Sequence, residues 1–271
     1  MPPRLLAFDL DGTLLATDKH LSDTNRDALL DMARSGSIVA LASGRLRSSM
    51  MRYARELGID TAMLALNGAA VYTTSAPDAP AVHTIDLPGA IAAELAADAA
   101  GKDFVLNYYR DDQVYATRTA VTAPWMGLYV RQTNSQYRFV ESYEEILDRA
   151  PAKIIFVGDP AVLDKEEAHY RARWGTSVYI VRTWNYYLEF LHPTATKGTG
   201  IAALARALGV ALADVAAFGD AANDIPMLEA VGHPVAMANA EEAVKRASRY
   251  VSPWSNDQDG VAREWERLKK L

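Results

Sequence analysis

Near its N-terminus the chain reads Leu5-Leu6-Ala7-Phe8-Asp9-Leu10-Asp11-Gly12-Thr13-Leu14. The apolar residues of this stretch are typical of a strand that is buried on both faces of a parallel sheet. Asp9 and Asp11 come where the strand should end, and Gly12 permits a sharp turn beside the hydroxyl of Thr13. Because open α/β sheets bind ligands at the carboxyl ends of strands, we expect both carboxylates to face a crevice. Paired carboxylates suit a divalent cation or a nucleophile, although a strand with a plain Asp-Gly turn would show the same letters.

The composition is that of a globular protein with enough apolar material for a large core. The chain has 271 residues, of which 50% are hydrophobic and 23% charged, and its net charge is -6. This acidic balance argues against a nucleic-acid partner, and no apolar run is long enough to cross a membrane. No cysteine is present, which excludes disulfides, thiolate zinc sites and cysteine nucleophiles. Without a signal-peptide pattern we expect a cytoplasmic protein, and nothing indicates its oligomeric state.

Strand and helix patterns alternate on both sides of a different middle region. Before it, a helix capped by Ser22 and closed by Gly36, and a second helix at 46–57, separate the first strand from strands at 38–42 and 62–66, which predicts parallel strands with right-handed crossovers. After it, the pattern predicts helices at 199–208, 225–230, 241–247 and 261–271, with strands at 215–218, 234–237 and 250–251. The fold class that follows is α/β, with a Rossmann-like three-layer core around a parallel sheet.

The middle region begins after a predicted hairpin at 71–86 and holds most of the tyrosines. Its pattern predicts helices at 90–100, 143–149 and 161–174. The expected strands lie at 104–109, 114–117, 154–158, 178–181 and 187–191, with a further helix and a short strand between the second and third of these. We interpret it as a second α/β domain at 87–189, inserted between the core segments 1–86 and 190–271.

Three further segments place polar groups beside helices or strand ends. Ser43-Gly44 offers a hydroxyl and an accessible N–H at a helix start, which suits an anion but also suits a plain cap. Lys197 precedes a helix, where a cation opposes the helix dipole, so it is either a surface lysine or a cation for a bound phosphate. Gly219-Asp220-Ala221-Ala222-Asn223-Asp224 gathers two carboxylates and an amide at a strand end, although part of it would serve to cap the next helix.

Together these segments resemble, in the right order, the motifs of the haloacid dehalogenase-like (HAD) phosphohydrolases. The matching segments are Phe8-Asp9-Leu10-Asp11-Gly12-Thr13-Leu14, Ser43-Gly44-Arg45, Lys197 and Gly219-Asp220-Ala221-Ala222-Asn223-Asp224. Three others resemble the Cof-type branch: Asn67-Gly68-Ala69, Ala236-Met237-Ala238-Asn239-Ala240 and Asp259-Gly260-Val261. The position and size of the insertion are similar to the large α/β cap of that branch.

The resemblance implies Mg²⁺-dependent hydrolysis of a small phosphorylated metabolite, such as a sugar phosphate, through an aspartyl phosphate. Asp9 is then the nucleophile, and Asp11 the general acid and base, which requires a raised pKa. The implied metal ligands are Asp9, Asp220 and Asp11, the last through its backbone carbonyl. The groups implied to hold the phosphate are Lys197, Gly12, Ser43, Gly44 and Asn223, with Thr13, Arg45 and Asp224 in support.

The insertion should carry the substrate preference, because the motifs outside it contact only the phosphoryl group that all such substrates share. Side-chain type alone suggests five residues for contacts with the leaving group: Tyr108, Arg110, Arg182, Trp184 and Asn185. The aromatic members would equally suit a domain core. We assign His192 no role and expect a buried histidine with its hydrogen bonds satisfied.

Other functions stay open at this stage. A phosphosugar mutase would use the same aspartyl phosphate, and a protein that only binds phosphometabolites would share the site. Gly198-Thr199-Gly200-Ile201-Ala202-Ala203 fits a dinucleotide fingerprint, but no strand runs directly into its first glycine, so we reject an oxidoreductase. No Walker-type phosphate loop is present.

Overall fold

The computed structural model describes residues 2–119, 122–133 and 135–270, which form two compact units. We call them the core unit, Met1–Thr84 with Thr196–Leu271, and the inserted unit, Ile85–Ala195. The boundary expected at 189/190 falls inside strand β11 (Tyr187–Leu191), which pairs with β9 (Lys153–Gly158) as far as Leu191. This pairing places the structural boundary later in the chain.

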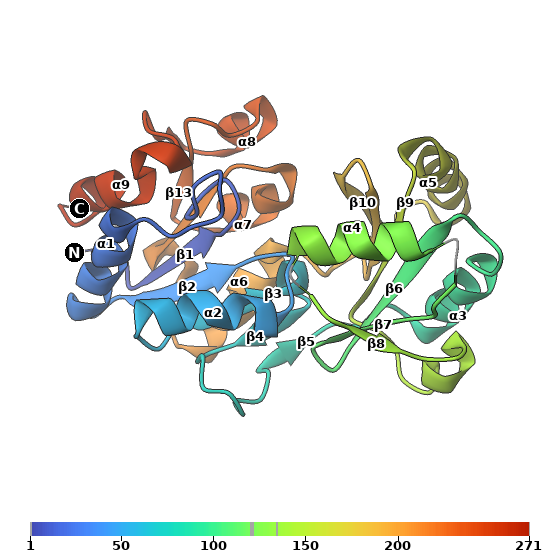
Figure 1. Cartoon of the computed structure of the whole chain (residues 1–271). Helices are drawn as coiled ribbons and strands as arrows, with labels where there is room; N and C mark the ends of the chain where they lie inside the picture. The colour runs from blue at the N-terminus through green and yellow to red at the C-terminus, as the bar shows by residue number, and fades with distance from the viewer. Residues whose placement is uncertain (1, 120–121, 134, 271) are drawn as a thin grey trace. The chain divides into compact units, whose positions relative to one another are not determined.

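The core unit is built on one sheet with the strand order β14-β13-β12-β1-β2-β3-β4-β5 (Figure 1). Neighbouring strands from β14 to β3 run parallel, and a hairpin of β4 and β5 adds two antiparallel strands at one edge. The parallel strands are β1 (Leu5–Asp9), β2 (Ile38–Ala42), β3 (Ala62–Ala65), β12 (Val215–Gly219), β13 (His233–Ala236) and β14 (Tyr250–Val251); the hairpin is β4 (Ala70–Tyr72) and β5 (His83–Thr84). The predicted parallel sheet is confirmed, and β1 lies near its middle, where its carboxyl end is flanked on both sides.

Helices make this core a three-layer structure. On one face, Leu5 and Ala7 of β1 pack into a buried cluster with Ile201 of α6, Met227 of α7 and Val244 of α8. Because side chains alternate along a strand, the neighbours of these residues face the other side of the sheet. The helices of the first face are α6 (Lys197–Ala207), α7 (Ile225–Ala230) and α8 (Glu242–Ala247), and those of the second are α1 (Asp23–Arg34), α2 (Arg47–Leu57) and α9 (Gly260–Leu268).

The helix ends follow the signals in the sequence. Ser22 is the N-cap of α1, where its side chain accepts a hydrogen bond from the Asn25 N–H at 3.1 Å. Gly58 ends α2 in the left-handed conformation at φ 66°. Capping by a hydroxyl and termination at a left-handed glycine are the usual ways to satisfy the free groups at helix ends.

The inserted unit has its own sheet, in the order β10-β11-β9-β6-β7-β8, which is antiparallel apart from the pair β7–β8. Helices α3 and α5 cover one face of this sheet, over an apolar cluster that includes Phe156. The elements not yet named are β6 (Phe104–Arg110), β7 (Gln113–Ala116), β8 (Tyr137–Phe139), β10 (Tyr179–Trp184), α3 (Gly89–Asp98), α4 (Ala123–Thr133) and α5 (Pro160–Trp174). No helix in the described ranges is both long and apolar enough to cross a membrane.

One expected helix of the inserted unit is shorter than the pattern predicts. In place of a helix over 143–149, the chain forms a 3-10 turn at Tyr143–Ile146. Arg110 Nη1 donates to the Ile146 carbonyl at 2.8 Å, which occupies an acceptor that a continuing helix would use. The helix prediction was therefore wrong beyond the first turn.

Candidate active site

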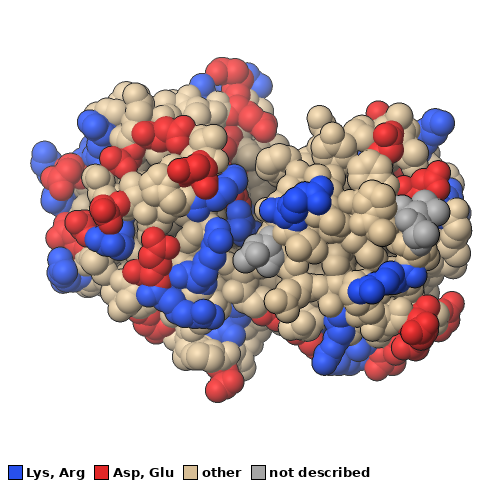
Figure 2. Space-filling view, viewed as in Figure 1, with Lys and Arg blue, Asp and Glu red and all other residues tan. Residues whose placement is uncertain are grey.

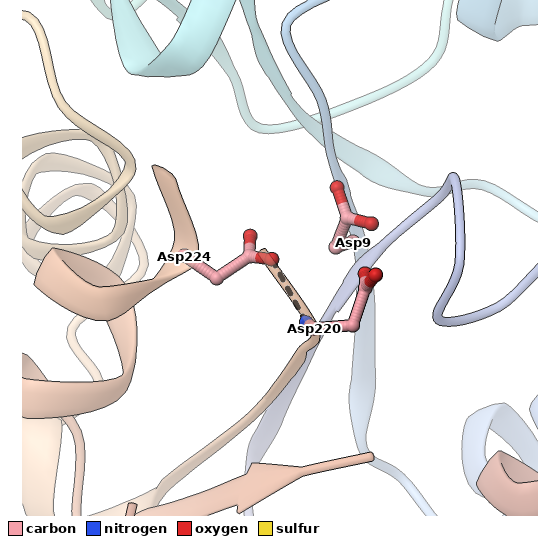
Figure 3. A group of neighbouring side chains, drawn as sticks. All are labelled: Asp9, Asp220 and Asp224. Carbon is pink, nitrogen blue, oxygen red and sulfur yellow. Dashed lines mark hydrogen bonds between the residues drawn. The ribbon is translucent and has the colours of Figure 1, made fainter. Parts of the chain in front are cut away.

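Three carboxylates meet at the carboxyl edge of the core sheet. Asp9 is the last residue of β1, Asp220 directly follows β12, and Asp224 lies one turn later at the start of α7. Each contributes an oxygen to a group in which all the oxygens lie within 4.8 Å of one another. Figure 3 shows the Asp9 and Asp220 carboxyl groups side by side, and the Asp224 carboxylate bonded to the Asp220 N–H. The parallel pairing of β1 with β12 brings these residues together across more than 200 positions of sequence.

Lys197 neutralises part of this cluster from the N-terminus of α6. Its Nζ lies 2.5 Å from Asp9 Oδ1 and 2.5 Å from Asp224 Oδ1, and the lysine side chain is fully buried. Asp224 Oδ2 in turn accepts from the backbone N–H groups of Asp220 and Ala221 at 3.0 and 3.1 Å. Lys197 is therefore buried and is not a surface lysine. Two buried carboxylates stabilise its charge at the N-terminus of α6, where the helix dipole disfavours a cation.

The cluster carries more negative charge than Lys197 balances. Burial and the charges of Asp224 and Asp220 raise the pKa of Asp9 well above its ordinary value, although Lys197 acts in the opposite direction. Burial, with the charge of Asp224, raises the pKa of Asp220 to about 6. Burial alone would lower the pKa of Lys197, but Asp224 and Asp9 outweigh it and raise this pKa. Three acids with one ammonium form a place where a further cation would be stabilised.

The turn after β1 is shaped around Asp220. Gly12 has φ 88°, and a Cβ on it would come within 2.4 Å of Asp220 Oδ2. Thr13 donates from its hydroxyl to Asp220 Oδ1 at 2.8 Å. Asn239 Nδ2 donates to the Gly12 carbonyl at 2.8 Å, which fixes the turn from the β13 side. The glycine is therefore required both by its backbone conformation and by the approach of the carboxylate.

The Asp11 carboxylate does not belong to the group formed by Asp9, Asp220 and Asp224. Arg45 grips its carboxylate with two hydrogen bonds of 2.8 and 2.6 Å, and Lys19 Nζ lies 2.9 Å from Asp11 Oδ1. Burial acts to raise the pKa of Asp11, but the hydrogen bonds and charges of Arg45 and Lys19 outweigh it, so this pKa is lowered. The raised pKa expected for a general acid is thus not found in this arrangement. No sequence pattern indicates this lowered pKa, because Lys19 and Arg45 reach Asp11 from separate loops.

A second group of polar residues surrounds Gly44. Asn223 Nδ2 donates to Asn67 Oδ1 at 3.0 Å, and the Asn67 N–H donates to the Ser43 carbonyl at 3.0 Å. A Cβ on Gly44 would lie 3.2 Å from Asn67 Oδ1, so the amide packs directly against this glycine. Among the described residues, the buried Asn67 Nδ2 has no hydrogen-bond partner. The structure therefore brings Ser43, Gly44 and Asn223 together, with Asn67 as the link between them.

The five residues suggested for leaving-group contacts have different environments in the inserted unit. Tyr108 is a fully buried core residue whose hydroxyl donates to the Arg149 carbonyl at 2.7 Å. Arg110 pairs with Asp148, and Arg182 pairs with Asp164 and Glu167 of α5. Only two of the five are exposed, Trp184 and Asn185. Tyr108 is thus a core residue, the alternative that was left open for the aromatic members, whereas Arg110 and Arg182 take part in ion pairs within the unit.

Two smaller sequence features are explained by local packing. His192 is half-buried, and its Nδ1 lies 2.8 Å from the hydroxyl of Thr194, which follows two residues later in the chain. The glycines of the rejected dinucleotide fingerprint lie inside α6. A Cβ on Gly198 would come within 2.4 Å of the Pro226 carbonyl oxygen, and one on Gly200 within 2.8 Å of Gly68 Cα. These glycines therefore let α6 pack closely against its neighbours.

Sequence reasoning missed Lys19 and gave Asn67 no role. Lys19 has left-handed backbone at φ 69° in a polar loop, and no sequence pattern marks such a residue. Asn67 has φ 58°, and Asn is enriched in this region of backbone conformation. An Asn-Gly pair directly after a buried strand is a signal that could have pointed to it.

The fold and the carboxylate–lysine site are those expected for the haloacid dehalogenase-like phosphohydrolases, and the sequence comparisons agree with this class. The profile of one family, described as haloacid dehalogenase-like hydrolase, matches residues 6–264. The chain therefore belongs to this family, as the motifs predicted, and it is a phosphatase of the Cof-type branch with a large α/β cap.

Individual relatives resemble the chain over most of its length. Phosphatase YwpJ of Bacillus subtilis (strain 168) is 26% identical over 288 residues, which cover 98% of this chain and 99% of that protein. An HMP-PP phosphatase of Serratia proteamaculans (strain 568) is 30% identical over 246 residues, or 89% of this chain and 86% of that protein. The crystal structure of a haloacid dehalogenase-like hydrolase from Bacteroides thetaiotaomicron has a TM-score of 0.88 at 27% identity and covers 98% of this chain and 99% of its own.

Proposed function

We propose that this phosphatase hydrolyses small phosphorylated metabolites with the help of Mg²⁺ and through a phosphoryl group bound covalently to Asp9. The observation that supports this most directly is the buried bridge of Lys197 between Asp9 and Asp224. It holds one oxygen of Asp9 at the edge of the sheet and leaves Asp9 Oδ2 outside the bridge. A fixed carboxylate beside a buried cation is what attack on an anionic phosphate ester requires.

The donor set of the cluster fits Mg²⁺. Its carboxylate oxygens are the hard ligands that this ion prefers, and neither Asp9 Oδ2 nor Asp220 Oδ2 takes part in the bonds to Lys197 and Thr13. Both oxygens of Asp224 are occupied, so Asp9 and Asp220 are the proposed side-chain ligands, with the Asp11 carbonyl as third ligand. Bound Mg²⁺ would supply positive charge beside the transferred phosphoryl group.

The chain's own residues divide the reaction into two steps. Asp9 attacks phosphorus, the bond from phosphorus to the ester oxygen breaks, and Asp11 gives a proton to that oxygen. Water then attacks the phosphorus of the aspartyl phosphate while Asp11 takes its proton, and release of phosphate restores Asp9. Lys197 and the groups around Gly44, including Asn223, hold the phosphoryl oxygens, whose charge is the main obstacle to the attack of one anion on another.

Asp11 needs a rearrangement before it can act as the acid. Its carboxylate is held by Arg45 and Lys19, which favour the ionised form. We infer that the carboxyl group leaves Arg45 when substrate occupies the site, and that Arg45 holds it in place between turnovers. Proton transfer then occurs only when a leaving group is present, which limits unproductive exchange with water.

The substrate class follows from the relatives and from the inserted unit. One relative is named for its action on HMP-PP, which supports a small phosphorylated metabolite as the substrate. We propose that the inserted unit sets the preference among such compounds. Trp184 is 55% exposed, so Trp184→Ala should change the ranking of substrates, whereas loss of Arg182 would also break two ion pairs of its unit.

A phosphate-release screen with Mg²⁺ tests the proposed function. We expect turnover of p-nitrophenyl phosphate and of some sugar phosphates or similar small esters, with a loss of roughly 10³-fold or more in Asp9→Asn. Asp23→Asn, which changes an exposed carboxylate of α1, is the matched control and should keep full activity. Ordinary turnover by Asp9→Asn would overturn the assignment, and an isomerised sugar phosphate without free phosphate would indicate a mutase.

A further inference from the structure

Asn67 carries a buried hydrogen-bond donor to which the proposed function assigns no partner. Its side chain is 1% exposed, and its Nδ2 has no hydrogen-bond partner among the described residues. Its Oδ1 is occupied, because it accepts from Asn223 Nδ2 at 3.0 Å. A buried amide that donates no hydrogen bond costs free energy, so such a group is expected where a ligand supplies the acceptor.

The backbone that presents this amide has an unusual conformation. Leu66, Asn67 and Gly68 are all left-handed, with φ of 53°, 58° and 88°. A leucine rarely adopts this region, because its Cβ approaches the following carbonyl oxygen. Two hydrogen bonds of 3.0 Å hold the turn, from the Leu66 N–H to the Arg45 carbonyl and from the Asn67 N–H to the Ser43 carbonyl. Strained backbone that its surroundings hold in place is concentrated at binding and catalytic sites.

The amide lies among residues that the proposed function gives to the phosphoryl group. A Cβ on Gly44 would lie 3.2 Å from Asn67 Oδ1 and 3.4 Å from its Nδ2, so the amide packs against this glycine. Asn223, which donates to Asn67, precedes Asp224, and the Asp224 carboxylate contacts Lys197. The unpartnered N–H groups of Asn67 therefore lie beside the residues proposed to hold the phosphoryl oxygens.

Burial adds to the strength of such a donor. Figure 2 shows Lys, Arg, Asp and Glu side chains over much of the visible surface, where water and salt screen them. Asn67 is instead shielded from water, and hydrogen bonds are electrostatically stronger where the local dielectric constant is low. Its amide is also neutral, so it can face an anion without a charged partner of its own.

We propose that Asn67 is a further catalytic residue, whose Nδ2 donates a hydrogen bond to an oxygen of the transferred phosphoryl group while its Oδ1 holds Asn223. This inference rests on the proposed function and adds a residue to the same site. Negative charge spreads over the phosphoryl oxygens during the transfer, so a donor that is fixed beforehand stabilises the transition state. The left-handed turn fixes the amide, and little reorganisation is needed when substrate binds.

Two substitutions of Asn67 in the full-length enzyme separate this role from a structural one. Asn67→Asp keeps the shape and the acceptor for Asn223, but it removes the donor and introduces a negative charge. Asn67→Gly removes the whole side chain and suits left-handed backbone. We measure kcat and KM for p-nitrophenyl phosphate in Mg²⁺ at pH 8, and the inhibition constant of inorganic phosphate. Thermal unfolding by circular dichroism checks that each variant is folded.

Asn107 of β6 supplies the matched control in the inserted unit. It is also fully buried, its Nδ2 has no partner in the described part of the chain, and its Oδ1 accepts from the Tyr137 hydroxyl at 3.0 Å. It belongs to none of the motifs that carry the proposed chemistry. Asn107→Asp therefore makes the same chemical change at a buried amide outside those motifs, and the inhibition constant of phosphate should stay as in the wild type.

The expected order of activity is wild type, then Asn67→Gly, then Asn67→Asp. In Asn67→Gly, kcat/KM should fall by about 10²-fold, as for the loss of one donor to a developing oxyanion. The inhibition constant of phosphate should rise by about tenfold, because a hydrogen bond to a charged group is lost. Asn67→Asp should lose about tenfold more in kcat/KM, because a carboxylate beside the phosphoryl group repels it.

Activity of Asn67→Asp close to that of the wild type, with a loss only in Asn67→Gly, would overturn the inference, because Asn67 would then act only by holding Asn223. If Asn67→Asp does not fold, Asn67→Gly is added to Asn223→Ala. A further loss of about tenfold is then expected, and no further loss would overturn the inference as well. In either case the phosphatase activity would stand. Failure of the wild type to release phosphate from p-nitrophenyl phosphate would instead overturn the proposed function, and the inference with it.

Discussion

Gly68 is a position where one methyl group should disturb the site from a distance. It follows β3 with φ 88°, and a Cβ on it would come within 2.3 Å of the Thr196 carbonyl oxygen. Thr196 is the N-cap of α6, and the next residue is Lys197. Gly68→Ala must therefore either move the first turn of α6 or distort the turn after β3.

Two terms set the expected size of the effect. An L-residue with left-handed backbone costs about 1–2 kcal/mol, and overpacking against a backbone atom costs about 1–3 kcal/mol. Their sum is about 2–5 kcal/mol, which corresponds to a fall in Tm of about 4–20 °C for a unit of this size. Phosphate release should fall by about 10²-fold, because a displacement near 1 Å at Lys197 is enough for such a loss.

Gly58 supplies the matched control. It also has left-handed backbone, at φ 66°, but a Cβ on it would meet nothing within 4 Å. Gly58→Ala should therefore show the backbone term alone, about 1–2 kcal/mol, with normal phosphate release. Thermal unfolding by circular dichroism and a p-nitrophenyl phosphate assay on both variants measure the difference. Equal Tm values together with equal activities would refute the claim that Gly68 holds the α6 terminus in place.

Three further outcomes are expected. EDTA should stop phosphate release and lower the Tm, and Mg²⁺ should restore both. The reason is that a bound cation offsets the excess charge of the buried carboxylates. Full activity in EDTA would exclude a metal. Glu189→Gln should destabilise the inserted unit by about 3–5 kcal/mol in urea unfolding, since it breaks the buried pair of Glu189 with Lys153 at 2.7 Å, whereas a cost below 1 kcal/mol would contradict that pairing. Burial acts to raise the pKa of Asp60, but hydrogen bonds from Thr74 and Ser75 outweigh it and lower this pKa. Its contribution to stability is therefore present above the unfolded pKa of about 3.9 and disappears as the pH falls, so Asp60→Asn should lower the Tm at pH 7 and have little effect near pH 2.

The sequence predicted the core better than the inserted unit, for physical reasons. Strand β2 was expected at 38–42 and found at Ile38–Ala42, because a short apolar run closed by polar residues fits a buried parallel strand. The helix expected at 143–149 ended after one turn, because Arg110 takes the Ile146 carbonyl from 36 residues away. A contact of that kind has no local signal, so periodicity overestimated the helix.

The candidate site shows the same division. The resemblance grouped Asp9, Lys197 and Asp220 in one site, and Asp9 and Asp220 meet there because parallel strands end at the same edge of a sheet. The environment of Asp11 was not predictable, since its ionic partner Lys19 lies on a loop whose path depends on tertiary contacts. Side-chain type also did not indicate whether Tyr108 is buried, and this residue belongs to the core of its unit.

Mass spectrometry of acid-quenched enzyme tests whether a phosphoryl group is transferred to Asp9. Asp11→Asn lacks the base for the second step, while p-nitrophenyl phosphate has a leaving group that needs no acid, so the intermediate should accumulate. We expect a burst of nitrophenol and one added PO₃ group on the peptide that contains Asp9, both of which should be absent from the double variant Asp9→Asn with Asp11→Asn. Steady phosphate release by Asp11→Asn without a modified peptide, or a phosphoryl group on another residue, would contradict it.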